Sequence, residues 1–92
     1  MTKYISPTDN QRKYILSAYG ESERRIREAE RKKLTSISRG HCYKLEVLGL
    51  FPSRCHFGRN SCAWLLSDIL WWIRNPPKVE NINNPYSRKN RK

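Results

Sequence analysis

The sequence is poor in acidic residues and in long apolar runs, and each shortage excludes a class of protein. Only 8 of its 92 residues are Asp or Glu, against 19 Lys or Arg, which leaves a formal charge of +11 at pH 7. The longest apolar-rich stretch, residues 63–73, is interrupted by Ser67 and Asp68 and is far shorter than the roughly 20 residues that cross a bilayer. The first residues lack the apolar core of a signal peptide. We therefore expect a cytoplasmic protein without a membrane segment.

Patterns for catalysis and for metal binding are also missing. The two histidines, His41 and His56, have no carboxylate or nucleophile at a recognisable spacing, so we expect no enzyme activity. The three cysteines, Cys42, Cys55 and Cys62, are an odd number without a C-x-x-C pair, and adjacent His and Cys residues point in different directions. We expect reduced thiols that fill the core in preference to a zinc site, and hence no metal or other cofactor.

The basic charge is concentrated in the middle and at the end of the chain. Residues 1–23 sum to zero, residues 24–74 carry +7 and residues 75–92 carry +4. Such an excess favours a polyanionic partner, through phosphate neutralisation and release of counterions. An anionic membrane surface would call for an amphipathic helix with a broad apolar face or for a lipidation signal, and neither is evident. Nucleic acid is therefore the expected partner.

An N-terminal helical extension is predicted within residues 1–23. Ser6 followed by Pro7 is a helix start, apolar and aromatic side chains then recur at helical spacing, and Gly20 can end the helix. We expect this helix to cover an edge of the core, with docking of a partner as the alternative.

The next region has the pattern of a helix-turn-helix. Residues 25–27 predict a short extended piece and residues 28–34 a short helix with acids at its N-terminal end. Thr35, Ser36 and Ser38 supply turn and capping chemistry for a second helix over residues 39–48. A short helix, a turn and a second helix predict this motif.

The second of these helices has two distinct faces. Cys42, Leu45 and Leu48 recur every three residues and are predicted to pack inward. The residues left on the opposite side are Arg39, Gly40, Tyr43, Lys44 and Val47. In a major groove, the two cations would reach guanine edges or phosphates, and Tyr43 a phosphate or a thymine methyl group. A solvated basic face is the alternative.

A β-hairpin and a closing helix are predicted next. Residues 54–57 and 62–65 are expected to be strands joined by a Gly-Arg-Asn-Ser turn, with Trp64 in the core. Ser67 is the expected N-cap of a last helix, which ends before Pro76-Pro77. On that helix Trp71 and Arg74 fall on the polar side, as a protein contact surface or as a surface covered by residues 1–23.

The last residues, 76–92, form a basic tail with almost no apolar content. We expect it to be disordered when free. It would add phosphate attraction, or bind a partner protein.

Several of these elements form one extended pattern over about residues 24–74. Its parts, in chain order, are Arg25-Ile26-Arg27-Glu28-x-Glu30-Arg31, Thr35-x-x-Ser38-Arg39-x-x-x-Tyr43-Lys44-Leu45-Glu46, Gly49-x-Phe51-Pro52, Gly58-x-Asn60-Ser61-x-x-Trp64-x-x-Ser67-Asp68-Ile69 and Trp72-Ile73. This pattern resembles the AlpA-type phage regulators and excisionases, which are similar to the winged-helix proteins of the MerR superfamily.

The resemblance implies a mainly helical fold with a small β-hairpin, a winged helix-turn-helix domain over residues 24–75. It implies a DNA-binding protein of a prophage or integrative element, acting as a transcriptional regulator or as a recombination directionality factor (excisionase). The candidate DNA-contacting residues of the recognition helix are Ser38, Arg39, Gly40, His41, Tyr43 and Lys44. Those of the wing are Arg54, His56, Arg59, Asn60 and Ser61. The expected partners are double-stranded DNA with attachment-site or promoter repeats and a site-specific integrase.

Two other functions stay open, and the oligomeric state is an expectation. The charge and the aromatic residues Tyr43 and Trp71 also fit a general RNA- or single-strand-binding protein, although the pattern lacks a stacking platform. An adaptor that binds integrase through Trp71 and the N-terminal helix is the other alternative. Because the chain has no coiled-coil heptads, we expect a monomer in solution that assembles cooperatively on DNA.

Overall fold

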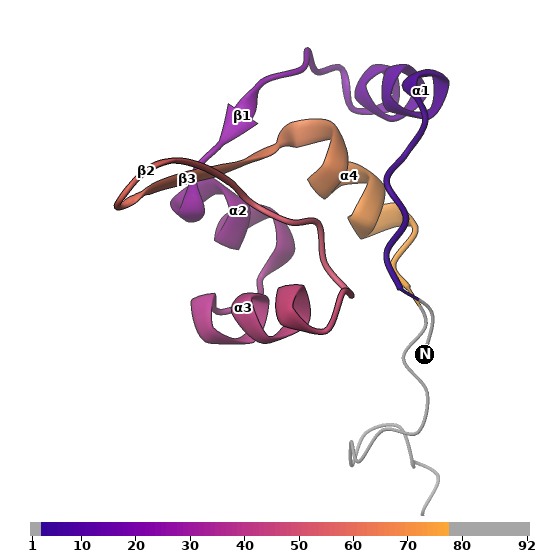
Figure 1. Ribbon diagram of the computed structural model, residues 1–92. Helices are drawn as coiled ribbons and strands as arrows, with labels where there is room; N and C mark the ends of the chain where they lie inside the picture. Colours follow the sequence, from indigo (N-terminus) through magenta and orange to yellow (C-terminus); the bar gives the residue numbers. More distant parts are fainter. Residues whose placement is uncertain (1–2, 78–92) are drawn as a thin grey trace, which may run out of the picture.

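The structure is a computed structural model that describes residues 3–77. Its elements, in chain order, are α1 (Asp9–Tyr19), β1 (Arg25–Ile26), α2 (Glu28–Thr35), α3 (Arg39–Val47), β2 (Cys55–Gly58), β3 (Ser61–Leu65) and α4 (Leu66–Arg74) (Figure 1). The predicted mainly helical fold with a small hairpin, a winged helix-turn-helix, is thereby confirmed. The predicted disorder of the basic tail concerns residues 78–92, which lie outside the described residues.

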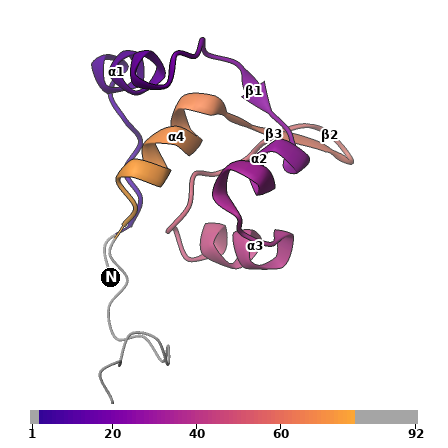
Figure 2. The same cartoon turned by 180° about the vertical axis from the view of Figure 1, so that it is seen from behind.

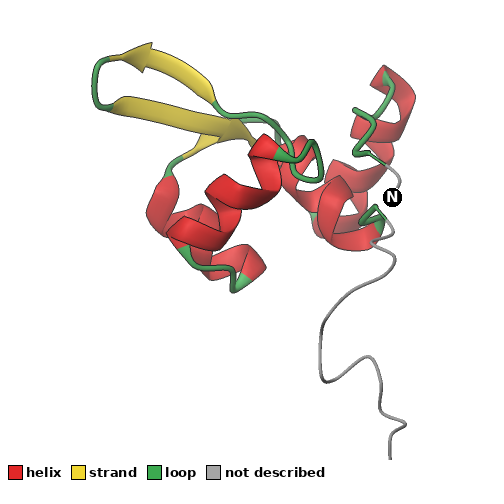
Figure 3. Cartoon of the chain, turned by 60° about the horizontal axis from the view of Figure 1, so that its bottom comes forward, coloured by secondary structure: helices red, strands yellow, loops and turns green. Residues whose placement is uncertain are grey.

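A small antiparallel sheet joins the helices. Its strand order is β1-β3-β2, with Ile26 opposite Trp64 and Cys55 opposite Ala63. The hairpin β2–β3 was expected from the sequence, whereas the pairing of the short strand β1 with β3 was not. Figure 3 shows the hairpin projecting away from the helices, which is the arrangement that gives a winged helix its name. We call the hairpin β2–β3 the wing.

The core lies between the sheet and α4. Trp64 from β3 is fully buried, and Ile26, Phe51, Ile69 and Leu70 surround it at 2 % exposure or less. Figures 1 and 2 show α4 lying between α1 on one side and the pair α2 and α3 on the other. Burial of these apolar side chains supplies the main driving force for folding, at about 25 cal/mol per Å² of apolar surface.

Helix α1 packs on this same core. Its Ile15 is 1 % exposed and belongs to the core cluster. The helix begins at Asp9, two residues later than the predicted start at Ser6-Pro7, because Thr8 is the N-cap. The Thr8 hydroxyl accepts from the Gln11 amide (3.1 Å), and the Gln11 side chain accepts from the Thr8 amide (2.9 Å), which forms a capping box.

The start of α4 differs from the prediction that Ser67 is its N-cap. The helix begins at Leu66 after Leu65, and Ser67 is buried in its first turn. Glu23 supplies the missing cap, since its carboxylate accepts from the Ser67 amide (3.0 Å) and from the Ser67 hydroxyl. Arg12 of α1 donates to the Ser67 hydroxyl (2.8 Å) and to Asp68 (2.9 Å). The N-terminal region therefore completes the first turn of α4.

A largely buried carboxylate, with a side chain that is 12 % exposed, ties α3 to the wing and to the core. Glu46 accepts from the Arg54 guanidinium at 2.9 Å and 3.1 Å, and from the Trp64 indole at 3.3 Å. The Cys42 thiol lies 3.6 Å from the same carboxylate, and Arg54 stacks over the Trp64 ring at 4.9 Å. These hydrogen bonds to Glu46 raise the pKa of Arg54 further above its usual value. We call Cys42, Glu46, Arg54 and Trp64 the Glu46 cluster.

Removing the central carboxylate should destabilise the fold strongly. We expect Glu46→Ala to lower the free energy of unfolding by about 3–5 kcal/mol, because it leaves the Arg54 guanidinium and the Trp64 indole without their acceptor. Urea unfolding followed by tryptophan fluorescence measures this change. The control is Glu30→Ala, which removes an exposed ion pair with Arg24 and should cost far less. Similar losses in the two variants would contradict the role given to Glu46.

The three cysteines should differ in reactivity. Burial raises the pKa of the Cys42 thiol to about 11, and its side chain is inaccessible, whereas Cys55 and Cys62 are half-buried. The thiolate is the nucleophile, so a raised pKa and burial both slow alkylation. We expect iodoacetamide at neutral pH to modify Cys55 and Cys62 well before Cys42, as followed by mass spectrometry of timed digests. Equal rates at the three sites would show that Cys42 is accessible.

Candidate nucleic-acid interface

A three-residue turn sets the angle between α2 and α3. Ser36 ends α2 in the left-handed conformation (φ 62°), and its amide donates to the Lys32 carbonyl. Ser38 then caps α3, since its hydroxyl accepts from the His41 amide at 3.2 Å. Ser38, one of the DNA contacts predicted from the sequence, therefore already uses its side chain to cap the start of the helix.

A buried arginine holds this turn in place. Arg31 of α2 is 0 % exposed and donates to the carbonyl of Ile37 (2.6 Å), to the Thr35 hydroxyl (3.1 Å) and to Glu28. Its guanidinium also lies over the Trp64 ring at 5.6 Å. A buried cation is tolerated only when its donors are satisfied, and here Glu28 at the start of α2 satisfies some of them and the turn satisfies the others. Arg31 is thus a structural residue, and its charge is paired with Glu28.

The inner face of α3 is only partly the one that the sequence pattern predicted. Cys42 is fully buried and Leu45 packs against the core, as expected. Leu48, also predicted to pack inward, is 50 % exposed. The helix ends at Val47 with Leu48 as its C-cap, and Gly49 takes a positive φ of 77°, so the chain leaves the helix before the three-residue pattern is complete.

The outer face of α3 is open to solvent. Arg39, Gly40, His41, Tyr43 and Lys44 are all exposed. Among the described residues, ion pairs engage Arg12, Arg24, Arg31 and Arg54, and neither Arg39 nor Lys44 takes part in one. These two cations therefore remain available to an external anion.

Gly40 leaves a gap in the middle of this face. A Cβ atom placed on it would meet no other atom within 4 Å, and its backbone has no positive φ. Neither packing nor backbone conformation within residues 3–77 therefore requires a glycine there. The missing side chain leaves room for another molecule to approach the helix backbone closely.

The wing carries the second set of candidate residues. His56, Arg59 and Asn60 are exposed, with the last two at the tip of the hairpin, and Ser61 is half-buried. A register shift between His56 and Gly58 twists the strand just before the tip. Phe57 was not predicted as a candidate from the sequence; it is 56 % exposed on this strand and lies under the Arg25 guanidinium at 5.3 Å. The signal that the sequence offers is an aromatic residue directly before the basic turn of the hairpin.

Arg54, also a wing candidate, lies at the base of the hairpin. Its guanidinium is held by Glu46 of α3 and by the ring of Trp64. Because this pair joins the end of α3 to the start of β2, it fixes the wing relative to the helix. Figure 1 shows both α3 and the wing on the side of the molecule away from α1.

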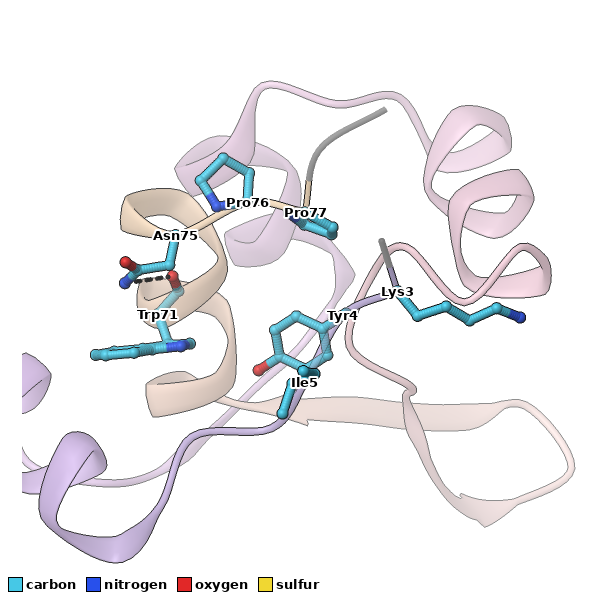
Figure 4. A pocket seen from close by; sticks show the side chains of 7 residues that line it. All are labelled: Lys3, Tyr4, Ile5, Trp71, Asn75, Pro76 and Pro77. Atoms are coloured by element: carbon cyan, nitrogen blue, oxygen red, sulfur yellow. Dashed lines mark hydrogen bonds between the residues drawn. The ribbon is translucent and has the colours of Figure 1, made fainter. Parts of the chain in front are cut away.

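Trp71 lies on the opposite side of the molecule, beside the N-terminal segment. It is half-buried and lines one hollow with Lys3, Tyr4 and Ile5 (Figure 4). It also lines a second hollow with Tyr14. Two alternatives were predicted for Trp71, a protein contact surface and a surface covered by residues 1–23. The geometry favours the second.

Arg74, the other residue predicted to contact a partner, is exposed at the end of α4. Its guanidinium stacks over the ring of Tyr19 at 5.7 Å. That contact further joins the end of α4 to α1.

The described part of the chain has neither a metal-binding cluster nor a membrane-spanning helix. Residues 3–77 contain no group of three or more His, Cys, Asp or Glu side chains placed to hold a metal ion. None of the helices in this range has the length and apolar character to cross a membrane.

Comparison with protein families identifies one match. The family model described as Prophage CP4-57 regulatory protein (AlpA) matches residues 24–77, more than half of the chain. Comparisons with curated proteins and with solved structures each gave no match. The matched residues run from β1 through α4, so they include the helix-turn-helix, the wing and the closing helix, whereas α1 precedes them. The resemblance seen in the sequence is confirmed, and the chain belongs to the family of the prophage regulatory protein AlpA.

Proposed function

We propose that this protein binds double-stranded DNA in a sequence-specific manner, with α3 in the major groove and the wing on the adjacent backbone or minor groove. The observation that carries the proposal is the outer face of α3, where Arg39, Tyr43 and Lys44 stand exposed around Gly40. Arginine and lysine are the side chains that read guanine edges and neutralise phosphates. Membership of a regulatory family supports the same function.

The dimensions of α3 suit this role. An α-helix with its side chains is about 10–12 Å in diameter, which fits a major groove about 12 Å wide. The nine residues of α3 extend about 14 Å along its axis, at 1.5 Å per residue. At Gly40 the absence of a side chain lets the helix backbone lie close to the groove. The wing tip, with Arg59 and Asn60, would reach the neighbouring phosphates. The fixed link through Arg54 and Glu46 would keep helix and wing in register on the duplex.

Within this function, we propose a role in the excision or transcription of a prophage or integrative element. A monomer that assembles cooperatively on repeated sites, near an attachment site or a promoter, is the arrangement we favour. A site-specific integrase is the protein partner that an excision role would need. The exposed residues of α1 lie away from α3 and so leave room for such a partner (Figure 1).

A second candidate function is general binding of RNA or single-stranded DNA. Exposed aromatic residues on the basic side, Tyr43 and Phe57, favour it, because bases stack on such rings. The two rings belong to different elements, α3 and β2. Competition of a bound duplex with RNA and with single-stranded DNA of equal length separates the two functions.

Lys44→Ala should separate base reading from phosphate attraction. We expect it to weaken binding to a specific duplex about tenfold or more, and binding to a random duplex far less, because a base contact contributes about 1–3 kcal/mol of discrimination. Gel-shift titrations at two salt concentrations measure both affinities, with DNA that flanks the protein's own gene as the specific duplex. The matched control is Lys13→Ala, an exposed lysine of α1, which should leave both affinities nearly unchanged.

Equal losses on the two duplexes would assign Lys44 to the phosphate backbone instead. In that case the salt dependence of binding should also become shallower by about one unit of slope. If random DNA displaces the specific duplex completely from the wild-type protein, the proposed sequence-specific function is wrong.

Gly40→Ala should change stability and DNA affinity in opposite directions. Alanine is the better helix former by up to about 1 kcal/mol, and open space surrounds the position, so the free energy of unfolding should rise. Affinity for the specific duplex should fall, because the added methyl group occupies the space that the groove approaches. Urea unfolding and gel-shift titration of the same preparation give the two values. An alanine variant with unchanged affinity would contradict close approach at this residue.

A further inference from the structure

The C-terminal half of the outer face of α3 is apolar, unlike its N-terminal half. Tyr43, Val47 and Leu48 are 62 %, 67 % and 50 % exposed. Together with Lys44 they line a shallow hollow of about 340 Å³. Exposed apolar side chains that occur singly need no explanation, but a cluster on one short helix is typical of a contact surface.

The hollow is continuous with the face that we propose enters the groove. Gly40 and Val47 are seven residues apart, about two helical turns, so they lie in line along the helix. Both are opposite the buried Cys42, at the middle of the exposed face. Tyr43 and Lys44 flank this line. The apolar floor at Val47 is therefore presented to the same ligand as the basic side chains.

The chemistry of the major groove limits which groups the apolar side chains of this hollow can contact. Base edges there carry hydrogen-bond donors and acceptors, with one apolar group, the C5-methyl of thymine. An apolar hollow set between a phenol and a lysine stem matches a methyl group next to acceptor atoms, since thymine O4 lies beside the methyl. The edges of guanine, adenine and cytosine present ring nitrogen, carbonyl or amino groups there and offer Val47 no methyl group to contact.

We propose that this hollow reads thymine, with Val47 as the residue that contacts the C5-methyl group. The inference rests on the proposed function. It adds that the DNA site contains thymine at the position that faces this hollow. It makes Val47, which was seen on the outer face but not counted among the DNA contacts, a determinant of specificity.

Removal of single methyl groups from the DNA tests the proposal. A duplex is first selected by the full-length protein from a random-sequence pool, and each thymine is then replaced in turn by deoxyuridine, which lacks only the methyl group. We expect affinity to fall about three- to fivefold at one or two positions, from the loss of one buried methyl contact each. The side chain is exposed, so Val47→Ala should fold normally, and it should bind the thymine and deoxyuridine duplexes equally. The matched control is Ile5→Ala, an apolar residue that is 75 % exposed in the N-terminal segment, and it should keep the difference.

Each other outcome is distinguishable. A protein that selects no duplex would overturn the proposed function, and the inference with it. Specific binding that is indifferent to every thymine methyl would overturn the inference alone, as would a Val47→Ala variant that keeps the thymine preference. Loss of higher-order complexes in Val47→Ala, with the thymine preference intact, would assign the hollow to contacts between copies of this chain and also overturn it.

Discussion

The geometry of the proposed interface depends on one largely buried carboxylate. Glu46 stands on the inner side of α3 and accepts hydrogen bonds from the base of the wing and from the indole at the centre of the core. A buried ion pair contributes little net stability compared with apolar packing, because both charges lose their water. Its value here is directional, since Arg54 makes several bonds to one carboxylate and also stacks on Trp64. These directional bonds hold the helix and the wing at a fixed distance. An apolar contact in the same place would allow the two elements to slide against each other.

Local sequence signals predicted the elements but not the bonds that arrange them. The helix-turn-helix and the hairpin follow from capping residues, turn residues and spacing within about ten positions. Glu46, by contrast, reads as an ordinary surface acid, because its partner Trp64 lies 18 positions further on. Ser67 reads as a helix cap, because Glu23, which caps the helix in its place, lies 44 positions earlier. Such partners come together only in the folded chain, and no local pattern reports them.

The candidate site was predicted in part for the same reason. The exposed basic residues of α3 follow from helical periodicity, which also placed Cys42 and Leu45 inside. Leu48 was assigned to the wrong face because the periodic pattern continues in the sequence after the helix has ended. Phe57 was missed because a strand residue next to a turn has no preferred side until its partner strand and Arg25 are known.

The pairing of β1 with β3 has a consequence for how this surface arises during folding. Ile26 and Trp64 are register partners, and everything between them, both helices of the motif and the first strand of the wing, forms one closed circuit of chain. Closing such a circuit costs entropy that grows only slowly with its length, and the cost is recovered when the buried side chains at the closure point pack. The recognition helix is short and has little intrinsic stability of its own. A fragment that contains only the helix-turn-helix would therefore lack the pairing of β1 with β3 that holds its two helices rigidly in place. The DNA-facing surface depends on the whole closed circuit.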